Sequence, residues 1–92
     1  MVEKKEKRSN AQRVSDVKSA VNVAVHYLKA VTREAHEIRV EETEFDEARK
    51  HWVITLSFEA GTDAWLSDRQ FKEFRIKVED GTVLSMKIRK IG

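Results

Sequence analysis

The chain has 92 residues, of which 40% are hydrophobic and 37% charged, and it contains no cysteine. This length allows one domain with a thin core, and the composition excludes a disulfide-stabilised scaffold. The net charge is only +2, but it is divided along the chain. Residues 1–13 carry five basic and two acidic side chains. Residues 37–50 carry three basic and six acidic side chains, and residues 69–92 carry seven basic and three acidic ones. Such a division can orient a docking partner.

We expect residues 1–12 to form a flexible charged tail, because they hold several cations and few apolar groups. Residues 13–92 are expected to form a single domain. The first residues lack the apolar segment of a signal peptide, and no stretch reaches the roughly 18 apolar residues of a membrane span. These features predict a cytoplasmic protein without a membrane partner.

A helix is predicted over residues 14–32, and an extension to Ala35 stays open. Apolar residues recur at spacings of three and four, which places them on one helical stripe. The stripe consists of Val14, Val17, Val21, Ala24, Val25, Leu28, Val31 and Ala35. Ser15 or Asn10 is a candidate N-cap, and Asp16 suits the first turn.

A first strand is predicted over residues 37–45. Its first apolar residues point to the core, but strict alternation would then bury two glutamates, which is costly. A β-bulge near Glu41–Glu42 avoids this cost, because it shifts Thr43 and Phe45 onto the inner face.

A second strand, over residues 51–59, shows the clearest alternation in the chain. A loop over 60–68 leads to a third strand over 69–78, and a fourth strand follows over 82–91. The expected inner residues of these strands are Trp52, Ile54, Leu56, Phe58, Phe74, Ile76, Val78, Leu84, Met86 and Ile88.

The turn between the last two strands sets their register. A two-residue turn would put the apolar residues of the fourth strand on the outer face. A three-residue loop over 79–81, with its glycine at positive φ, pairs Ile76 with Leu84. It also pairs Phe74 with Met86, so that all four share the core face. The sequence therefore predicts an α+β fold, with one N-terminal helix packed on a four-stranded antiparallel β-meander in the order α-β-β-β-β.

No catalytic or metal-binding constellation is visible in the sequence. The histidines, at positions 26, 36 and 51, lack the spacing of a helical metal site, and no cysteine joins them. The serines lie in no nucleophile motif, and there is no glycine-rich phosphate loop. We therefore expect neither an enzyme nor a cofactor or metal site.

Two surface features are candidates for binding. A candidate basic face on the outer side of the sheet consists of Arg39, Arg75, Lys77, Lys87 and Arg89. It could contact phosphates, but every strand aromatic except Phe71 points inward, whereas sheets that bind single strands usually present stacking aromatics. A solvated face is the alternative. Trp65 and Leu66, an apolar pair in a loop, are a candidate partner contact, or they fold back over the core.

Three segments of the chain resemble a known family. They are Ile-Arg-Val at 38–40, Trp-Val-Ile-Thr-Leu at 52–56, and the hairpin at 74–84 with its Glu-Asp-Gly-Thr-Val-Leu ending. Together they resemble PepSY-like domains, within the cystatin-like architecture of a helix wrapped by an antiparallel sheet. The likeness covers about residues 14–90. It implies a role in protease inhibition or in regulating a neighbouring domain, and it supplies no catalytic residue.

The favoured function is a small non-catalytic interaction or regulatory module whose partner is another protein. One alternative is a nucleic-acid-binding protein that uses the basic outer face and the N-terminal tail. A second alternative is a small-ligand-binding domain with a site between helix and sheet, near His26, Tyr27 and Trp52. Pairing of edge strands into a homodimer is compatible with all three.

Overall fold

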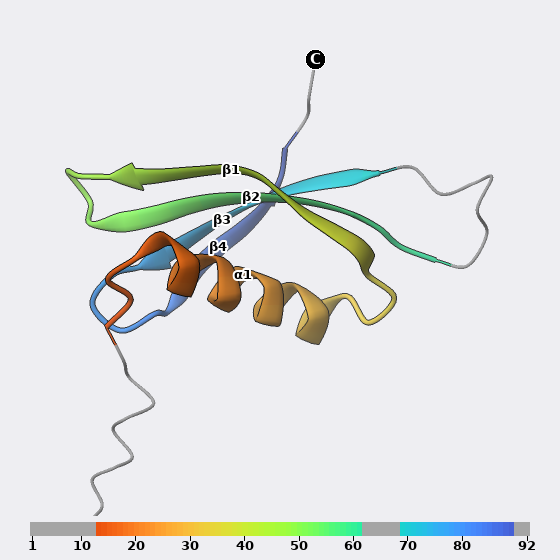
Figure 1. Ribbon diagram of the computed structural model, residues 1–92, viewed down its shortest axis with the longest axis horizontal. Coiled ribbons are helices and arrows are strands. Elements are labelled where there is room, and N and C mark those ends of the chain that lie inside the picture. The colour runs from red at the N-terminus through yellow and green to blue at the C-terminus, as the bar shows by residue number, and fades with distance from the viewer. Residues whose placement is uncertain (1–12, 62–68, 90–92) are drawn as a thin grey trace, which may run out of the picture.

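The computed structural model describes residues 13–61 and 69–89 (Figure 1). Within these residues, the helix α1 (Val17–Val31) is followed by the strands β1 (His36–Asp46), β2 (His51–Glu59), β3 (Gln70–Lys77) and β4 (Val83–Ile88). The strands form one antiparallel sheet in the order β1-β2-β3-β4. α1 lies across one face of this sheet (Figure 1). The predicted α-β-β-β-β fold is confirmed.

α1 begins at Val17 because Asp16 is its N-cap. The Ser19 backbone N–H donates to the Asp16 carboxylate at 2.9 Å, which satisfies one of the donors that a helix start leaves without a partner. Hydrogen bonding by Ser19 also lowers the pKa of the Asp16 carboxyl. The predictions that the helix starts at Val14 and that Ser15 or Asn10 caps it are therefore wrong.

The buried side of α1 is narrower than the apolar stripe in the sequence. Its fully buried residues are Ala20, Ala24 and Leu28, whereas Val17 and Val31 are exposed. Two of the three buried positions hold alanine, so the helix backbone lies close to the sheet. The position of α1 therefore depends on small side chains at its contact line.

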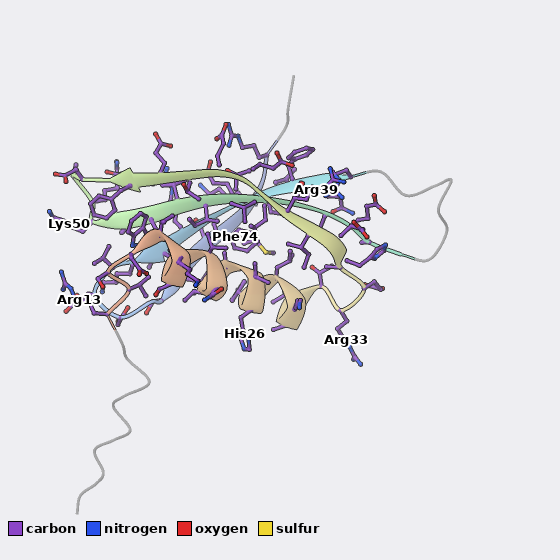
Figure 2. All side chains as sticks on the ribbon, in the orientation of Figure 1. Arg13, His26, Arg33, Arg39, Lys50 and Phe74 are labelled. Carbon is purple, nitrogen blue, oxygen red and sulfur yellow. The ribbon has the colours of Figure 1, made fainter. Side chains whose placement is uncertain are left out.

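The core lies between α1 and the two central strands. Ile54, Leu56 and Phe58 of β2 are fully buried, and so is Phe74 of β3. Phe74 meets Tyr27 of α1 edge to face, with ring centroids 6.4 Å apart, and Figure 2 shows Phe74 between the helix and the sheet. Burying a side chain of this size contributes about 1.5–3 kcal/mol, so these residues supply most of the stability.

β1 contains the predicted bulge. Its pairing with β2 shifts by one residue between Val40 and Glu42, which leaves Glu41 as the extra residue. Beyond the bulge, Phe45 pairs with Trp52, and their ring centroids are 4.9 Å apart. The shift thus puts Phe45 on the inner face and the glutamates on the outer face, as predicted. Val40 and Thr43, which were also predicted to point inward, are exposed.

The turn between β3 and β4 spans residues 78–81, one residue more than predicted. The Gly81 N–H donates to the Lys77 carbonyl, and the Lys77 N–H donates to the Thr82 carbonyl, both at 2.9 Å. Gly81 has a φ of 76°, which confirms the predicted positive φ. The longer turn moves the start of β4 by one residue relative to β3.

β4 compensates for the longer turn with a bulge. Ile76 pairs with Val83, and a register shift follows before the next pair, so Leu84 is the extra residue. Val83 therefore packs against the core in the place predicted for Leu84. The predicted pairing of Ile76 with Leu84 is wrong because the turn is one residue longer than predicted. The bulge then restores the predicted register from Ser85 onward.

The second half of β4 returns to the predicted register. Phe74 pairs with Met86 as predicted, and Met86 packs against the core. Leu84 and Ile88, however, are 46% and 73% exposed, so the prediction that they are core residues is wrong. Both lie on the strand at the edge of the sheet.

Backbone hydrogen bonds join three segments at the turn end of the sheet. The Val14 N–H donates to the Val78 carbonyl at 2.8 Å, and the Val78 N–H donates to the Lys50 carbonyl at 3.2 Å. The Trp52 indole N–H donates to the Val14 carbonyl at 2.9 Å. These bonds hold the residues before α1 against both hairpin turns, which explains why Val14 is buried outside the helix.

Candidate functional site

The outer face of the sheet, opposite α1, holds the predicted basic residues. They are Arg39, Arg75, Lys77, Lys87 and Arg89. The first four pair across strands with outer-face residues, and cross-strand partners share a face. Arg89 follows β4 and reaches the Thr55 hydroxyl of β2. These five side chains therefore lie on the same face of the sheet.

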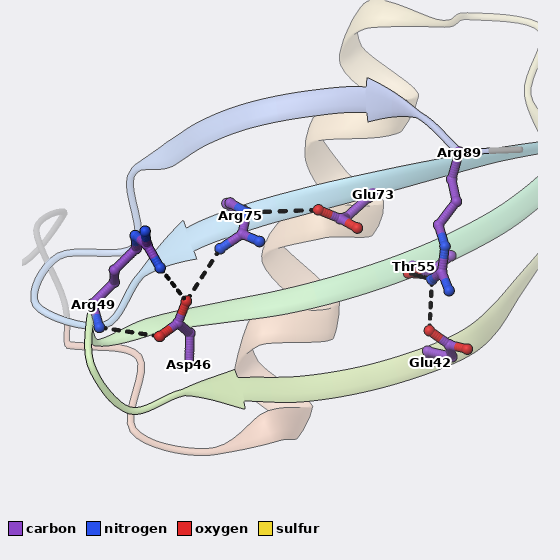
Figure 3. A network of polar contacts seen from close by, with 7 residues as sticks. All are labelled: Glu42, Asp46, Arg49, Thr55, Glu73, Arg75 and Arg89. Atoms are coloured by element: carbon purple, nitrogen blue, oxygen red, sulfur yellow. Dashed lines mark hydrogen bonds and ion pairs between the residues drawn. The ribbon is translucent and has the colours of Figure 1, made fainter.

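The same face also carries carboxylates, which were not part of the predicted basic face. They are Glu42, Glu44 and Asp46 on β1 and Glu73 on β3. The Arg75 guanidinium lies 3.4 Å from Asp46 and 3.6 Å from Glu73 (Figure 3). The predicted bulge already implied that the β1 glutamates face outward, so the signal for this mixed face was present in the sequence.

Arg89 closes a second contact network across the sheet. Its guanidinium donates to the Glu42 carboxylate, and it donates to the Thr55 hydroxyl at 2.8 Å (Figure 3). Hydrogen bonding by Arg89 lowers the pKa of the Glu42 carboxyl, and the same contact raises the pKa of Arg89. This cation is therefore committed to a carboxylate of the same molecule.

Charged side chains cover the centre of the outer face. Thr55 and Ser57 of β2 are buried, although the one helix of the described residues, α1, lies on the opposite face. Arg69 donates to the Ser57 hydroxyl at 2.9 Å, and that hydroxyl donates to Glu41 at 2.6 Å. Long charged side chains can bury their stems on apolar surface while their ends pair. The centre of the outer face is therefore a layer of paired charges, which leaves it poorly suited to collect phosphates.

This charged layer predicts how stability depends on pH. The pKa values of Glu42 and Asp46 are lowered in the folded protein because Arg89 and the Arg49 N–H, respectively, donate to these carboxylates. A carboxylate with a lowered folded pKa adds stability that is present above the unfolded value, about 4, and is lost as pH falls through the folded value. We expect the free energy of unfolding to fall below about pH 4.

Urea unfolding at a series of pH values measures this dependence. Glu42→Gln should make the fall below about pH 4 shallower, because the group that takes up the proton is gone. Glu34→Gln, a like change of a carboxylate outside the sheet, is the control and should leave the slope unchanged. Equal slopes in the wild type and Glu42→Gln would show that the Arg89 contact does not stabilise the fold.

A hollow of about 450 Å³ lies on the other side of the molecule, between α1 and β4. Its lining residues are Asn22, Val23, His26, Tyr27, Ala30 and Val83. The first five lie on one side of α1, at spacings that bring them together on a helix, and Val83 belongs to β4. Most of these side chains are apolar, so the hollow suits an apolar side chain better than a charged group.

β4 borders this hollow with an open backbone edge. The Arg89 N–H donates to the Phe71 carbonyl at 2.9 Å. In an antiparallel ladder the paired residues alternate between bonding to their partner strand and pointing away from it. The N–H and C=O groups of Met86 and Ile88 therefore point out of the sheet, where the described residues provide no further strand.

The opposite edge of the sheet, β1, is protected from pairing with another chain. It carries register shifts at two places, and Glu37 has a positive φ of 52°. Its residues are mostly exposed and charged. Bulges and charges are the devices by which sheet edges avoid pairing with another strand. β4 has one bulge, at Leu84, and beyond it presents exposed Ile88 on a regular edge, so the two edges differ in their readiness to bind a strand.

The residues of the predicted ligand site do not come together. His26 and Tyr27 line the hollow beside β4. Trp52 lines a separate hollow of about 300 Å³ at the turn end, together with Phe45 and Val78. His26 and Tyr27 are neighbours on α1, which places both beside the same hollow. Trp52 lies at the turn end, where it donates a hydrogen bond to the segment before α1.

The predicted partner contact, Trp65 and Leu66, lies outside the described residues. Across 13–61 and 69–89, no group of three His, Asp or Glu side chains could hold a metal ion. The helical part of the same ranges has neither the length nor the apolar character to cross a membrane.

The hollow and the adjoining edge of β4 together form the candidate site. We call this combination the β4 groove, defined by the hollow-lining residues above with Met86 and Ile88. Comparisons of the chain with models of known protein families, with curated protein sequences and with solved structures found no match.

Proposed function

We propose that the protein is a non-catalytic interaction module that binds an extended segment of a partner protein in the β4 groove. The single observation that carries this proposal is the open backbone edge of β4 beside an apolar hollow. Addition of a strand to a sheet edge uses main-chain hydrogen bonds for affinity and side-chain pockets for specificity. The resemblance to PepSY-like domains, with their inhibitory and regulatory roles, agrees with such a function.

The geometry of the groove defines the kind of segment that fits. A strand paired with Met86 and Ile88 would direct alternate side chains toward α1, because strand residues alternate between faces. Those side chains would enter the hollow beside Tyr27 and Val83, so they should be apolar. The intervening side chains would lie near Lys87 on the outer face, where acidic residues are favoured.

Nucleic-acid binding is the weaker candidate. Arg75 and Arg89, two of the five predicted contacts, each lie within ion-pair distance of a carboxylate of this chain. Phosphate contacts there would have to displace these carboxylates. The described strand aromatics apart from Phe71 lie on the inner face, which leaves few stacking partners.

Ile88→Pro tests the backbone part of the proposal. Proline lacks an N–H, and the Ile88 N–H points away from β3, so the substitution removes a donor to the partner without removing a bond of the β3–β4 ladder. A displayed library of random twelve-residue peptides would be selected on the wild-type protein. Selected peptides should carry apolar residues at alternate positions, and Ile88→Pro should weaken their binding at least about tenfold.

Ala30→Arg and Val31→Arg test the hollow as a matched pair. Both place arginine at neighbouring exposed positions of α1, but only Ala30 lines the hollow. Ala30→Arg should abolish binding of the selected peptides, and Val31→Arg should leave it nearly unchanged. Peptides without an alternating pattern, or equal binding by Ile88→Pro, Ala30→Arg and the wild type, would contradict the proposed function.

A further inference from the structure

A second hollow, of about 410 Å³, lies at the turn end of the sheet and is lined mainly by cations. Its lining residues are Arg13, Arg49, Lys50, Lys77, Val78 and Glu79. Four cations against one carboxylate give this lining a formal charge of +3, whereas the whole chain has +2. Figure 2 shows Arg13 and Lys50 at the same end of the molecule. Positive charge is therefore concentrated around one hollow.

The hollow has a fixed backbone frame. Its cations come from the segment before α1, from the β1–β2 turn and from the end of β3. The hydrogen bonds from Val14 to Val78 and from Val78 to Lys50 join these three segments. A ligand that bound here would not have to order the backbone, which keeps the entropic cost of binding small.

Lys50 has a backbone conformation that glycine adopts more readily than lysine. The two hairpin turns share one design: the Lys50 N–H donates to the Asp46 carbonyl at 2.8 Å, as the Gly81 N–H donates to the Lys77 carbonyl at 2.9 Å. The last turn residue has a φ of 58° at Lys50 and 76° at Gly81. Glycine adopts this region freely, whereas a lysine is strained there. Strain of this kind points to a role for the Lys50 side chain beyond folding.

The ion pairs that these cations make within the chain are each exposed on at least one side. Arg49 lies 3.3 Å from Asp46, and Lys77 lies 3.8 Å from Glu79. Arg49 and Glu79 are largely exposed in these pairs, and exposed ion pairs are weak. A dianion with several acceptor oxygens forms stronger, charge-assisted hydrogen bonds with arginine and lysine.

We propose that this hollow binds a phosphate group of a small ligand, held by Arg13, Arg49, Lys50 and Lys77. The four cations line a space large enough for such a group, hydrogen bonds join the backbone segments that carry them, and Lys50 has a positive φ. The site is independent of the β4 groove. The variant Ile88→Pro should therefore bind phosphate as the wild type does.

Titration calorimetry and thermal unfolding with inorganic pyrophosphate, at constant ionic strength, test the proposal. Pyrophosphate should bind with one site per chain and raise the melting temperature, because it binds the folded state. Sodium chloride and sulfate at the same ionic strength should have a smaller effect. Absence of saturable pyrophosphate binding by the wild type would overturn the proposal.

Lys50→Gly separates a binding role from a structural one. Relief of strain should raise its melting temperature by about 2–8 °C. Its affinity for pyrophosphate should fall about tenfold, because one charged donor is lost. The control Lys87→Ser removes the same charge on the outer face and should bind pyrophosphate within about twofold of the wild type. Unchanged binding by Lys50→Gly would overturn the proposal.

A 5′-phosphorylated single-stranded oligonucleotide distinguishes the source of the phosphate. If an oligonucleotide binds at this site, pyrophosphate should displace it and Lys50→Gly should weaken its binding. That result would support the phosphate site and would identify a nucleic-acid phosphate as one of its ligands. Oligonucleotide binding that pyrophosphate does not displace, together with no pyrophosphate binding, would contradict a phosphate site in this hollow.

Discussion

Replacing Phe74 with alanine should reduce the free energy of unfolding by about 3–5 kcal/mol, the largest effect expected of a single core change. Phe74 is fully buried in β3 and meets Tyr27 of α1 edge to face. Its removal leaves a cavity between the helix and the sheet and ends the aromatic contact. A domain of this size has roughly 5–14 kcal/mol in total, so the variant should be close to unfolding.

Urea unfolding followed by far-UV circular dichroism measures the effect of Phe74→Ala. Phe71→Ala is the matched control, because it makes the same change on the same strand but on the outer face, where Phe71 pairs with Ser57 and is only half-buried. The control should lose less than roughly half as much free energy. Comparable losses in the two variants would mean that the core does not lie beneath α1.

Ala24→Leu should reduce the free energy of unfolding by about 1–3 kcal/mol through overpacking. Ala24 is fully buried where α1 meets the sheet, so three added carbon atoms must displace either the helix or its neighbours. Because the same displacement would change the width of the β4 groove, selected peptides should also bind this variant less tightly.

Ala30→Leu is the counterpart on the same helix. Ala30 is exposed and lines the hollow, so a leucine there extends into open space and should leave stability within about 0.5 kcal/mol of the wild type. Thermal and urea unfolding of the two leucine variants compare one chemical change at two sites. Equal destabilisation would contradict the close approach of α1 to the sheet.

The order and faces of the strands could be predicted from the sequence because apolar alternation is local. The bulge at Glu41 could be predicted too, since the alternative required buried glutamates. Two boundaries could not. Several polar residues just before Asp16 could also cap the helix. The sequence fits a three-residue loop at 79–81 as well as it fits the observed four-residue turn at 78–81.

The error at Leu84 has a physical origin that a sequence does not reveal. A longer turn and a bulge cancel each other, so both registers place Met86 inward. Only side-chain packing decides whether Val83 or Leu84 meets the core. That choice left Leu84 exposed on β4, and Ile88 is exposed although it keeps the predicted register, so the edge that borders the groove could not be recognised from the sequence.

The outer face illustrates a different limit. The five cations share one face, but their chemistry depends on neighbours contributed by β1 and β3. Arg75 and Arg89 became partners of carboxylates only when the register brought those strands together. Charge counted along the sequence thus overstated the basic character of this face, whereas the cations at the turn end, from three separate segments, could not be grouped at all.

Amide hydrogen exchange of the protein, alone and with a selected peptide, tests the central claim most directly. Strand addition at β4 requires that the outward N–H groups of Met86 and Ile88 become hydrogen-bonded to the peptide. Exchange at these two amides should slow on binding, while the outward amides of β1 should keep their rates. Slowed exchange at β1 with β4 unchanged would contradict binding in the β4 groove.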